Sequence, residues 1–116
     1  MRVTAINSFI VEPSRQSELV EIATELSTFT SGLQGFIRQE IKRSEDGTRV
    51  LIITDWKSAD DHYNCMENAS QPPAGQRMIS LLASGAVQMH LGLYENVSAH
   101  WGCPIPQQVQ KPAVGA

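Results

Sequence analysis

Cysteine is scarce in this sequence, with only Cys65 and Cys103 among 116 residues. Two thiols so far apart form neither a disulfide framework nor a metal-binding pair such as Cys-x-x-Cys. We therefore expect both to be free thiols in a compartment that keeps cysteines reduced. A chain of this length has room for one compact domain and is too short for two ordinary ones.

Long apolar runs and one-sided charge are also missing. No apolar run approaches the roughly 20 residues of a membrane span, and the first residues lack the features of a signal peptide. Nine Lys and Arg against twelve Asp and Glu give a net charge of −3, with no long block of either sign. This balance excludes a basic groove for nucleic acid. We predict a cytoplasmic protein that binds neither membranes nor nucleic acid.

The common signatures of tightly bound cofactors are missing as well. The sequence contains no Gly-x-Gly-x-x-Gly, no phosphate-binding loop, no His-Glu-x-x-His and no Cys-x-x-Cys. Each of these patterns places backbone amides or ligating side chains around a phosphate, a nucleotide or a metal ion. The sequence therefore predicts no bound cofactor and no metal site.

What is present is a regular succession of strand and helix patterns. Strand-forming residues occupy 2–11, 35–43, 49–56 and 86–97, and Glu45-Asp46-Gly47 is typical of a hairpin turn. Apolar residues recur at helical spacing after Pro13-Ser14, after the capping residue Ser58 and up to Ser84-Gly85. The order strand, helix, strand, strand, helix, strand predicts an α+β, ferredoxin-like fold, in which helices cover one face of a four-stranded antiparallel sheet.

The other face of this sheet is too apolar to lie open to water. Residues 2–11 are apolar on both faces, and 50–53 are four consecutive apolar residues. We expect a second copy of the chain to cover this face, sheet against sheet, in a symmetric homodimer. The alternative is that a tail helix crosses the face, but the tail, residues 99–116, contains three prolines that argue against a helix.

A few polar side chains stand among the apolar segments. Asn7 lies in the middle of the first strand, Trp56 ends the third, and His62 and Tyr63 follow on the next helix. In a cavity between sheet and helices, these groups could orient a ring-shaped ligand. The ordinary alternatives are that Asn7 bonds a neighbouring strand, Trp56 closes the core, and His62 and Tyr63 are surface or boundary residues.

Four segments resemble the antibiotic biosynthesis monooxygenase family in their order and spacing: Ile6 to Pro13, Gly35-Phe36, the turn Arg43 to Gly47, and Asp55 to Ser58. The resemblance covers residues 2–97, which gives a domain 1–98 followed by a Pro-rich tail 99–116. It implies a dimeric α+β barrel. It also implies a cofactor-independent monooxygenase that uses molecular oxygen to oxidise an aromatic polyketide or related polycyclic intermediate, such as an anthrone, in secondary-metabolite biosynthesis.

The resemblance also assigns residues. Trp56 matches the tryptophan whose indole N–H hydrogen-bonds a substrate oxygen in anthrone oxygenases. Their Asn four residues earlier is Ile52 here, and their Tyr six residues later is His62. We expect Trp56, His62 and Asn7 to be catalytic, with His62 as the base because its unperturbed pKa is near 6.5. The expected substrate contacts are Tyr63, Arg77, Ile52, Phe9 and His90.

Three other functions remain open on the same residues. A polyketide cyclase or isomerase would use the same pocket and proton-transfer groups without oxygen. A non-catalytic ligand-binding dimer is favoured by Ile52 in place of the usual Asn. The heme-degrading branch of the superfamily matches at Asn7 and Trp56, but Met66 takes the place of its iron-ligating His.

Overall fold

The computed structural model describes residues 1–102 of the chain, so Cys103 and most of the Pro-rich tail lie outside the described residues. Its elements are β1 (Val3–Val11), a 3-10 turn (Pro13–Arg15), α1 (Gln16–Thr30), β2 (Phe36–Arg43), β3 (Arg49–Trp56), α2 (Ala59–Asn68), α3 (Pro73–Ala83) and β4 (Val87–Tyr94). Among the helices of this part, none combines the length and the apolar character that crossing a membrane requires.

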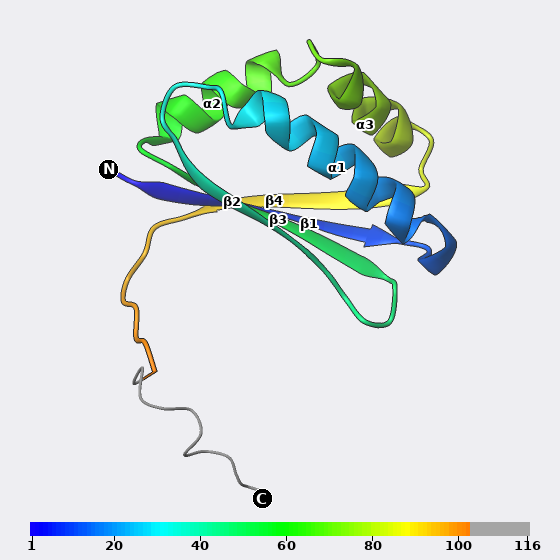
Figure 1. The fold of residues 1–116 in the computed structure, drawn as a ribbon, viewed down its shortest axis with the longest axis horizontal. Helices are drawn as coiled ribbons and strands as arrows, with labels where there is room; N and C mark the ends of the chain where they lie inside the picture. Colours follow the sequence, from blue (N-terminus) through cyan, green and yellow to red (C-terminus); the bar gives the residue numbers. More distant parts are fainter. Residues whose placement is uncertain (103–116) are drawn as a thin grey trace, which may run out of the picture.

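The four strands form one antiparallel sheet in the order β2-β3-β1-β4, and all three helices lie on one of its faces (Figure 1). The predicted α+β, ferredoxin-like fold is confirmed. The last strand ends at Tyr94 rather than at residue 97. Tyr94 pairs with Thr4, and β1 begins at Val3, so β4 runs out of a partner strand at this point.

The hairpin between β2 and β3 fixes the register that places the site. The Asp46 carboxylate accepts hydrogen bonds from the Thr48 amide at 3.0 Å and from the Thr48 and Ser44 hydroxyls at 2.7 Å. Bonds from Thr48 and Ser44 lower the pKa of Asp46 to about 2. Gly47 adopts φ 82°, which glycine reaches without strain. The hairpin thereby directs Val50, Ile52, Thr54 and Trp56 of β3 toward the helices, where all four are buried.

The core between sheet and helices consists of two clusters. The larger one contains Phe9, Leu19, Val50 and Met78 with six other buried residues. The smaller one contains Ala5, Trp56 and Cys65. Asn7 lies on β1 between Ala5 and Phe9 and faces the helices as they do, because strand residues alternate between faces. A polar side chain therefore stands where the two clusters meet.

Helix α2 begins directly after β3 at the predicted cap. The Asp61 amide donates to Ser58 Oγ at 3.2 Å, and Ser58 Oγ donates to Asp61 Oδ2 at 2.9 Å. The Lys57 amide donates to the Gly35 carbonyl at 2.8 Å, which joins the end of β3 to the residue before β2. These bonds hold the first turn of α2 against the sheet, so that His62 and Cys65 of α2 are buried.

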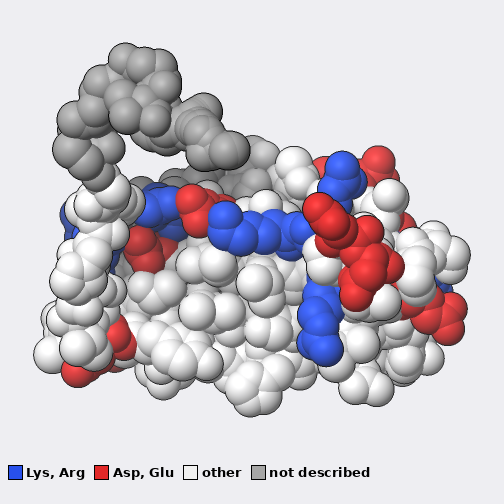
Figure 2. Space-filling model, turned by 90° about the horizontal axis from the view of Figure 1, so that it is seen from below, with Lys and Arg blue, Asp and Glu red and all other residues white. Residues whose placement is uncertain are grey.

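No element within residues 1–102 covers the opposite face of the sheet. This open face consists of the side chains that alternate away from the helices: Thr4, Ile6, Ser8 and Ile10 of β1, Leu51, Ile53 and Asp55 of β3, Arg38, Glu40 and Lys42 of β2, and Gln88, His90 and Tyr94 of β4. In Figure 2 uncharged side chains cover a broad part of the face beside a band of charged ones. Ile10 is 48% exposed there.

Candidate functional site

A cavity of about 80 Å³ lies between the sheet and helices α1 and α2. Its wall includes Asn7 from β1, Ile52 and Trp56 from β3, and His62 from α2. The three residues expected to be catalytic therefore line one cavity, together with one expected substrate contact. Other hollows of the described chain are larger, among them two of about 640 Å³ and about 540 Å³.

Asn7 carries an unused hydrogen-bond acceptor in this cavity. Its register partners are Ile52 on β3 and Leu91 on β4, both apolar. Asn7 Oδ1 is buried and has no hydrogen-bond partner within the described part of the chain. Leaving a buried acceptor unpaired costs about 1–3 kcal/mol. A molecule in the cavity that donates an O–H or N–H to Asn7 Oδ1 removes this cost.

Trp56 forms the wall of the cavity at the end of β3. The side chain is 1% exposed, and its ring meets Phe36 edge-on, with centroids 5.8 Å apart and an interplanar angle of 85°. The packing orients the indole from one side, while the cavity borders it on another. Trp56 is therefore a core residue whose side chain also borders the cavity.

His62 enters the cavity from the first turns of α2. The residue is 3% exposed, and burial lowers the pKa of its imidazole below the usual 6.5 because a buried cation loses its hydration. The ring is therefore neutral near pH 7. A neutral imidazole has one lone pair that can accept a proton, which is the state a general base needs.

The pKa shift of His62 predicts how stability depends on pH. The unfolded chain protonates this histidine near pH 6.5, whereas the folded chain resists protonation until a lower pH. Below pH 6.5 the unfolded state binds more protons, so stability falls as the pH decreases toward the folded-state pKa. In urea unfolding between pH 7.5 and 5.5, we expect the wild type to lose more stability than His62→Gln. Equal losses in the two proteins would contradict a buried, neutral His62.

Cys65 lies in the same wall, one turn after His62. Burial raises the pKa of its thiol, and a hydrogen bond with Thr30 offsets this only in part. The protonated thiol is a poor nucleophile and a poor metal ligand. Within residues 1–102, no three His, Cys, Asp or Glu side chains gather into a group that could hold a metal ion.

The other four expected substrate contacts lie outside this cavity. Tyr63 is 55% exposed beside His62, and Phe9 is buried in the larger core cluster. Arg77 of α3 pairs with Glu25 Oε2 of α1 at 2.5 Å, in a surface groove between these helices. His90 pairs with Ser8 in the register of β4 and β1, and strand alternation places it on the open face.

The sequence analysis missed four polar lining residues, which are Ser27 and Thr30 of α1, Gln39 of β2 and Thr54 of β3. Gln39 Nε2 of β2 donates to Thr54 Oγ1 of β3 at 2.9 Å, and both side chains line the cavity. Thr54 could have been found, because it lies two residues before Trp56 and therefore on the same face. Gln39 could not, because a register irregularity between Phe36 and Arg38 shifts β2 against β3, and no residue pattern marks it.

The volume of the cavity is small for the expected polycyclic substrate. A cavity of about 150 Å³ accepts benzene, and ligand pockets usually measure about 300–1,000 Å³. At about 80 Å³ this closed form has room for about two water molecules. A polycyclic molecule therefore requires the walls to part. Helix α2 forms one of these walls, and of its ten residues only His62 and Cys65 are buried.

Comparison with known proteins shows which family the sequence matches. The model of the family described as antibiotic biosynthesis monooxygenase matches residues 2–70, which include Asn7, Trp56 and His62. A search of curated proteins finds no significant match.

Solved structures share the fold at low sequence identity. SnoaB, a cofactor-independent oxygenase from Streptomyces nogalater, is 20% identical with a TM-score of 0.58, over 89% of this chain and 97% of that one. Rv0793 from Mycobacterium tuberculosis is 14% identical with a TM-score of 0.66, over 85% and 98%. A conserved protein from Methanosarcina mazei Go1 is 13% identical with a TM-score of 0.64, over 84% and 94%. Since the family model covers more than half of the sequence, the chain belongs to the antibiotic biosynthesis monooxygenase family.

Proposed function

We propose that this protein is a cofactor-independent monooxygenase that oxidises an aromatic polyketide or a related polycyclic intermediate in the cavity beneath α2. The observation that carries the proposal is that three residues line one cavity: Asn7, whose Oδ1 has no partner within the described residues, Trp56, and His62 with its neutral imidazole. Membership of the family supports it, as does the fold shared with a cofactor-independent oxygenase.

The chemistry requires an electron-rich substrate. Triplet oxygen reacts slowly with a neutral closed-shell ring, whereas a phenolate or an enolate can give it an electron. His62 takes the phenolic or benzylic proton that generates this anion. The anion then reacts with oxygen, one oxygen atom enters the product as a carbonyl, and the other leaves as water with two hydrogens of the substrate. The substrate is its own reductant, so the balance needs no further electron donor.

Trp56 and Asn7 hold the substrate and its charge. The indole N–H donates to the oxygen on which negative charge develops, and Asn7 Oδ1 accepts from a substrate hydroxyl. Ile52 belongs to the larger core cluster and its side chain supplies no hydrogen bond, so the stabilisation depends on fewer donors than in relatives with Asn at that place. A substrate in the cavity displaces water from it, which strengthens each remaining contact.

Oxygen uptake with an anthrone in the presence of a metal chelator tests the function. With ¹⁸O₂ we expect one labelled oxygen in the quinone and one in water. Equal turnover under argon would show a cyclase or isomerase instead. Tight binding without turnover would show a ligand-binding protein, and turnover that requires heme would show the heme-degrading activity. Each of these three results would overturn the proposal. Ile79→Ala, on the exposed side of α3, is the matched control and keeps full activity.

Trp56→Phe tests the indole N–H. Phenylalanine keeps an aromatic ring against Phe36 but has no donor, so we expect kcat/KM to fall by about 1–3 kcal/mol of transition-state stabilisation, roughly 5- to 150-fold. Phe36→Leu is the control, because it disturbs the same packing and leaves the N–H in place. An unchanged kcat/KM in folded Trp56→Phe would remove the role of the donor.

We also propose that the protein works as a cytoplasmic homodimer that is joined through the open face. Without a partner, the open face would present four large apolar side chains to water, because no helix or strand within the described residues covers it. These side chains are Ile6, Ile10, Leu51 and Ile53. Sedimentation at several concentrations should give twice the monomer mass at micromolar protein. A monomer throughout this range would contradict the dimer.

A further inference from the structure

The cavity beneath α2 adjoins a second hollow on the helix side of the sheet. This hollow has a volume of about 350 Å³ and lies between the C-terminal part of α1 and the edge strand β2. Ser27 of α1 and Gln39 of β2 line both spaces, so their side chains form the partition between them. We call the second space the α1–β2 hollow. Its other lining residues are Thr28, Ser31, Phe36 and Ile41.

Few contacts hold this partition in place. Ser27 Oγ donates to the Thr24 carbonyl of its own helix at 2.6 Å, and Gln39 Nε2 donates to Thr54 Oγ1 at 2.9 Å. Gln39 is half-buried, and its long side chain turns about several single bonds. A neutral hydrogen bond adds little net stability, because water can replace either partner. When Gln39 turns aside, the cavity opens into the α1–β2 hollow.

The α1–β2 hollow offers hydrogen-bond acceptors and no charge. The Ser27 and Ser31 hydroxyls donate to carbonyl oxygens of α1 itself, so their own oxygens remain as acceptors. Gln39 Nε2 is engaged by its bond to β3, which leaves the amide oxygen to accept. None of the described residues that line the hollow is charged, and Phe36 and Ile41 supply apolar surface. This lining suits an uncharged ring that carries hydroxyl donors.

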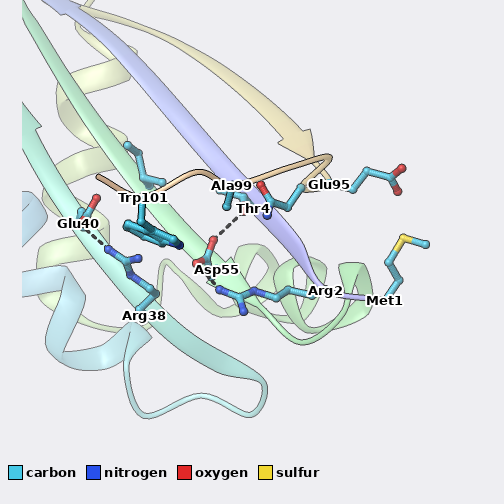
Figure 3. Close-up of a pocket in the computed structure, with 11 residues that line it drawn as sticks. Met1, Arg2, Thr4, Arg38, Glu40, Asp55, Glu95, Ala99 and Trp101 are labelled. Carbon is cyan, nitrogen blue, oxygen red and sulfur yellow. Dashed lines mark hydrogen bonds and ion pairs between the residues drawn. The ribbon is translucent and has the colours of Figure 1, made fainter. Parts of the chain in front are cut away.

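The hollow of about 640 Å³ on the open face is of a different kind (Figure 3). Among the side chains that border it, Arg2 donates to Asp55 Oδ2 at 2.8 Å, and Arg38 pairs with Glu40. Strand alternation places these side chains on the face opposite the cavity, so the sheet separates the two spaces. A ligand in the cavity can therefore extend into the α1–β2 hollow but not into this charged one.

We propose that the α1–β2 hollow is a second subsite, which binds the distal, hydroxyl-bearing ring of an uncharged polycyclic substrate while the reacting ring occupies the cavity. Gln39 then decides how long a substrate the protein accepts. The inference rests on the proposed function for the identity of the reacting ring and adds the place where the rest of the molecule binds. With the hollow included, the space comes within the range of about 300–1,000 Å³ that is usual for ligand pockets.

The spacing of the strands fits a substrate of three fused rings. Asn7 of β1 lies opposite Ile52 of β3, and Gln39 of β2 lies opposite Thr54 of the same strand. Neighbouring strands are about 4.8 Å apart, so the backbones of β1 and β2 are separated by roughly 10 Å. Three fused rings with an oxygen at each end have a similar length. A donor at one end can thus reach the unpaired Asn7 Oδ1 while a donor at the other end reaches the hollow.

Binding of quinones, which are already oxidised, tests the subsite without relying on turnover. The probe 2,6-dihydroxyanthraquinone has a hydroxyl at each end of three rings, 2-hydroxyanthraquinone lacks the far hydroxyl, and 2-naphthol is too short to reach the hollow. Calorimetry in mildly acidic buffer, which keeps the phenols neutral, gives the Kd of each. We expect the wild type to bind the first roughly 2- to 10-fold more tightly than the second, the scale of one neutral hydrogen bond.

Thr28→Trp fills the hollow from outside, because Thr28 is exposed and lines the hollow but not the cavity. We expect the Kd of 2,6-dihydroxyanthraquinone to rise roughly tenfold or more, as when a pocket loses room for a group. The Kd of 2-naphthol should stay within about twofold, which also shows that the variant is folded. Thr24→Trp, at an exposed threonine one turn earlier that does not border the hollow, is the matched control and should change neither Kd.

Gln39→Ala tests the partition. Association of 2,6-dihydroxyanthraquinone in stopped-flow measurements should become faster, because binding no longer waits for the Gln39 side chain to move. An unchanged association rate would overturn the role of Gln39.

The remaining outcomes separate the subsite from the proposed function. An unchanged Kd of the three-ring quinone in Thr28→Trp would overturn the subsite, as would an equal loss for 2-naphthol. A loss in Met66→Trp without one in Thr28→Trp would also overturn it, because Met66 lines the cavity, is 44% exposed and offers a way out past α2. Failure of the wild type to bind any of the three probes would overturn both the subsite and the ring-binding cavity. The expected binding pattern without oxygen uptake on an anthrone would support the subsite and overturn the proposed monooxygenase.

Discussion

Replacing His62 by glutamine is expected to lower kcat/KM for an anthrone by roughly 10²- to 10⁴-fold, the range that a positioned general base contributes. Glutamine keeps a polar side chain of similar length but cannot take up a proton near neutral pH. His62 is buried in the cavity wall with Asn7 and Trp56, and its pKa is lowered by burial. Initial rates of oxygen uptake by the wild type and the variant give the ratio directly.

The pH profile adds a second measurement to the same variant. Because burial lowers the pKa of His62, the acid limb of kcat/KM in the wild type should have its midpoint below pH 6.5 and should be missing in His62→Gln. Cys65→Ala is the control, since it changes the same wall of the same helix without removing a base. A His62→Gln enzyme within threefold of the wild type, with its acid limb intact, would place the base elsewhere.

The sequence predicted most element boundaries because they have a local chemical cause. Asp46 and Gly47 form the hairpin turn through bonds that lie within five residues, and Ser58 caps α2 through Asp61. Apolar spacing separated strands from helices for the same reason. The end of β4 was misplaced because it depends on where β1 begins, which is a contact between distant segments.

The candidate site was predictable where strand alternation alone sets direction. Trp56 and Ile52 share a parity on β3, and their register with β1 brings Asn7 opposite Ile52. The positions of His90 and Arg77 could not be predicted from strand alternation alone. The side of the sheet that His90 faces follows from the pairing of β4 with β1, and the contact of Arg77 with Glu25 follows from how α3 packs on α1. Neither arrangement leaves a local pattern in the sequence.

The volume of the cavity is even harder to predict from the sequence. It is set by how closely α2 approaches the sheet, and at each end of α2 a glycine allows a close contact. At its start a Cβ on Gly35 would lie 2.1 Å from the Asp61 carboxyl carbon. At its end Gly75 of α3 meets Ala69, the residue after α2. Glycine is required at both positions by contacts that arise only when the chain is folded.

Gly75→Ala is therefore expected to destabilise the protein by about 3 kcal/mol and to lower its melting temperature by roughly 10 °C or more. A Cβ at this position would lie 1.7 Å from the Ala69 carbonyl oxygen and 2.8 Å from its carbon. Both atoms belong to the backbone, so no side-chain rotation relieves the clash, and α3 must separate from the end of α2. Thermal and urea unfolding measure the loss.

Gly32→Ala is the matched control for this prediction. Its new Cβ would meet only the Phe29 carbonyl oxygen at 3.6 Å, an ordinary contact, so the change should stay within about 0.5 kcal/mol. Gly75 lies against Ala69, the residue after the helix that carries His62. In Gly75→Ala protein that remains folded, the affinity for a ring-shaped ligand should therefore differ from that of the wild type. Equal stability of both variants would mean that α2 and α3 do not meet as closely as Gly75 requires, and the small cavity would lose its structural cause.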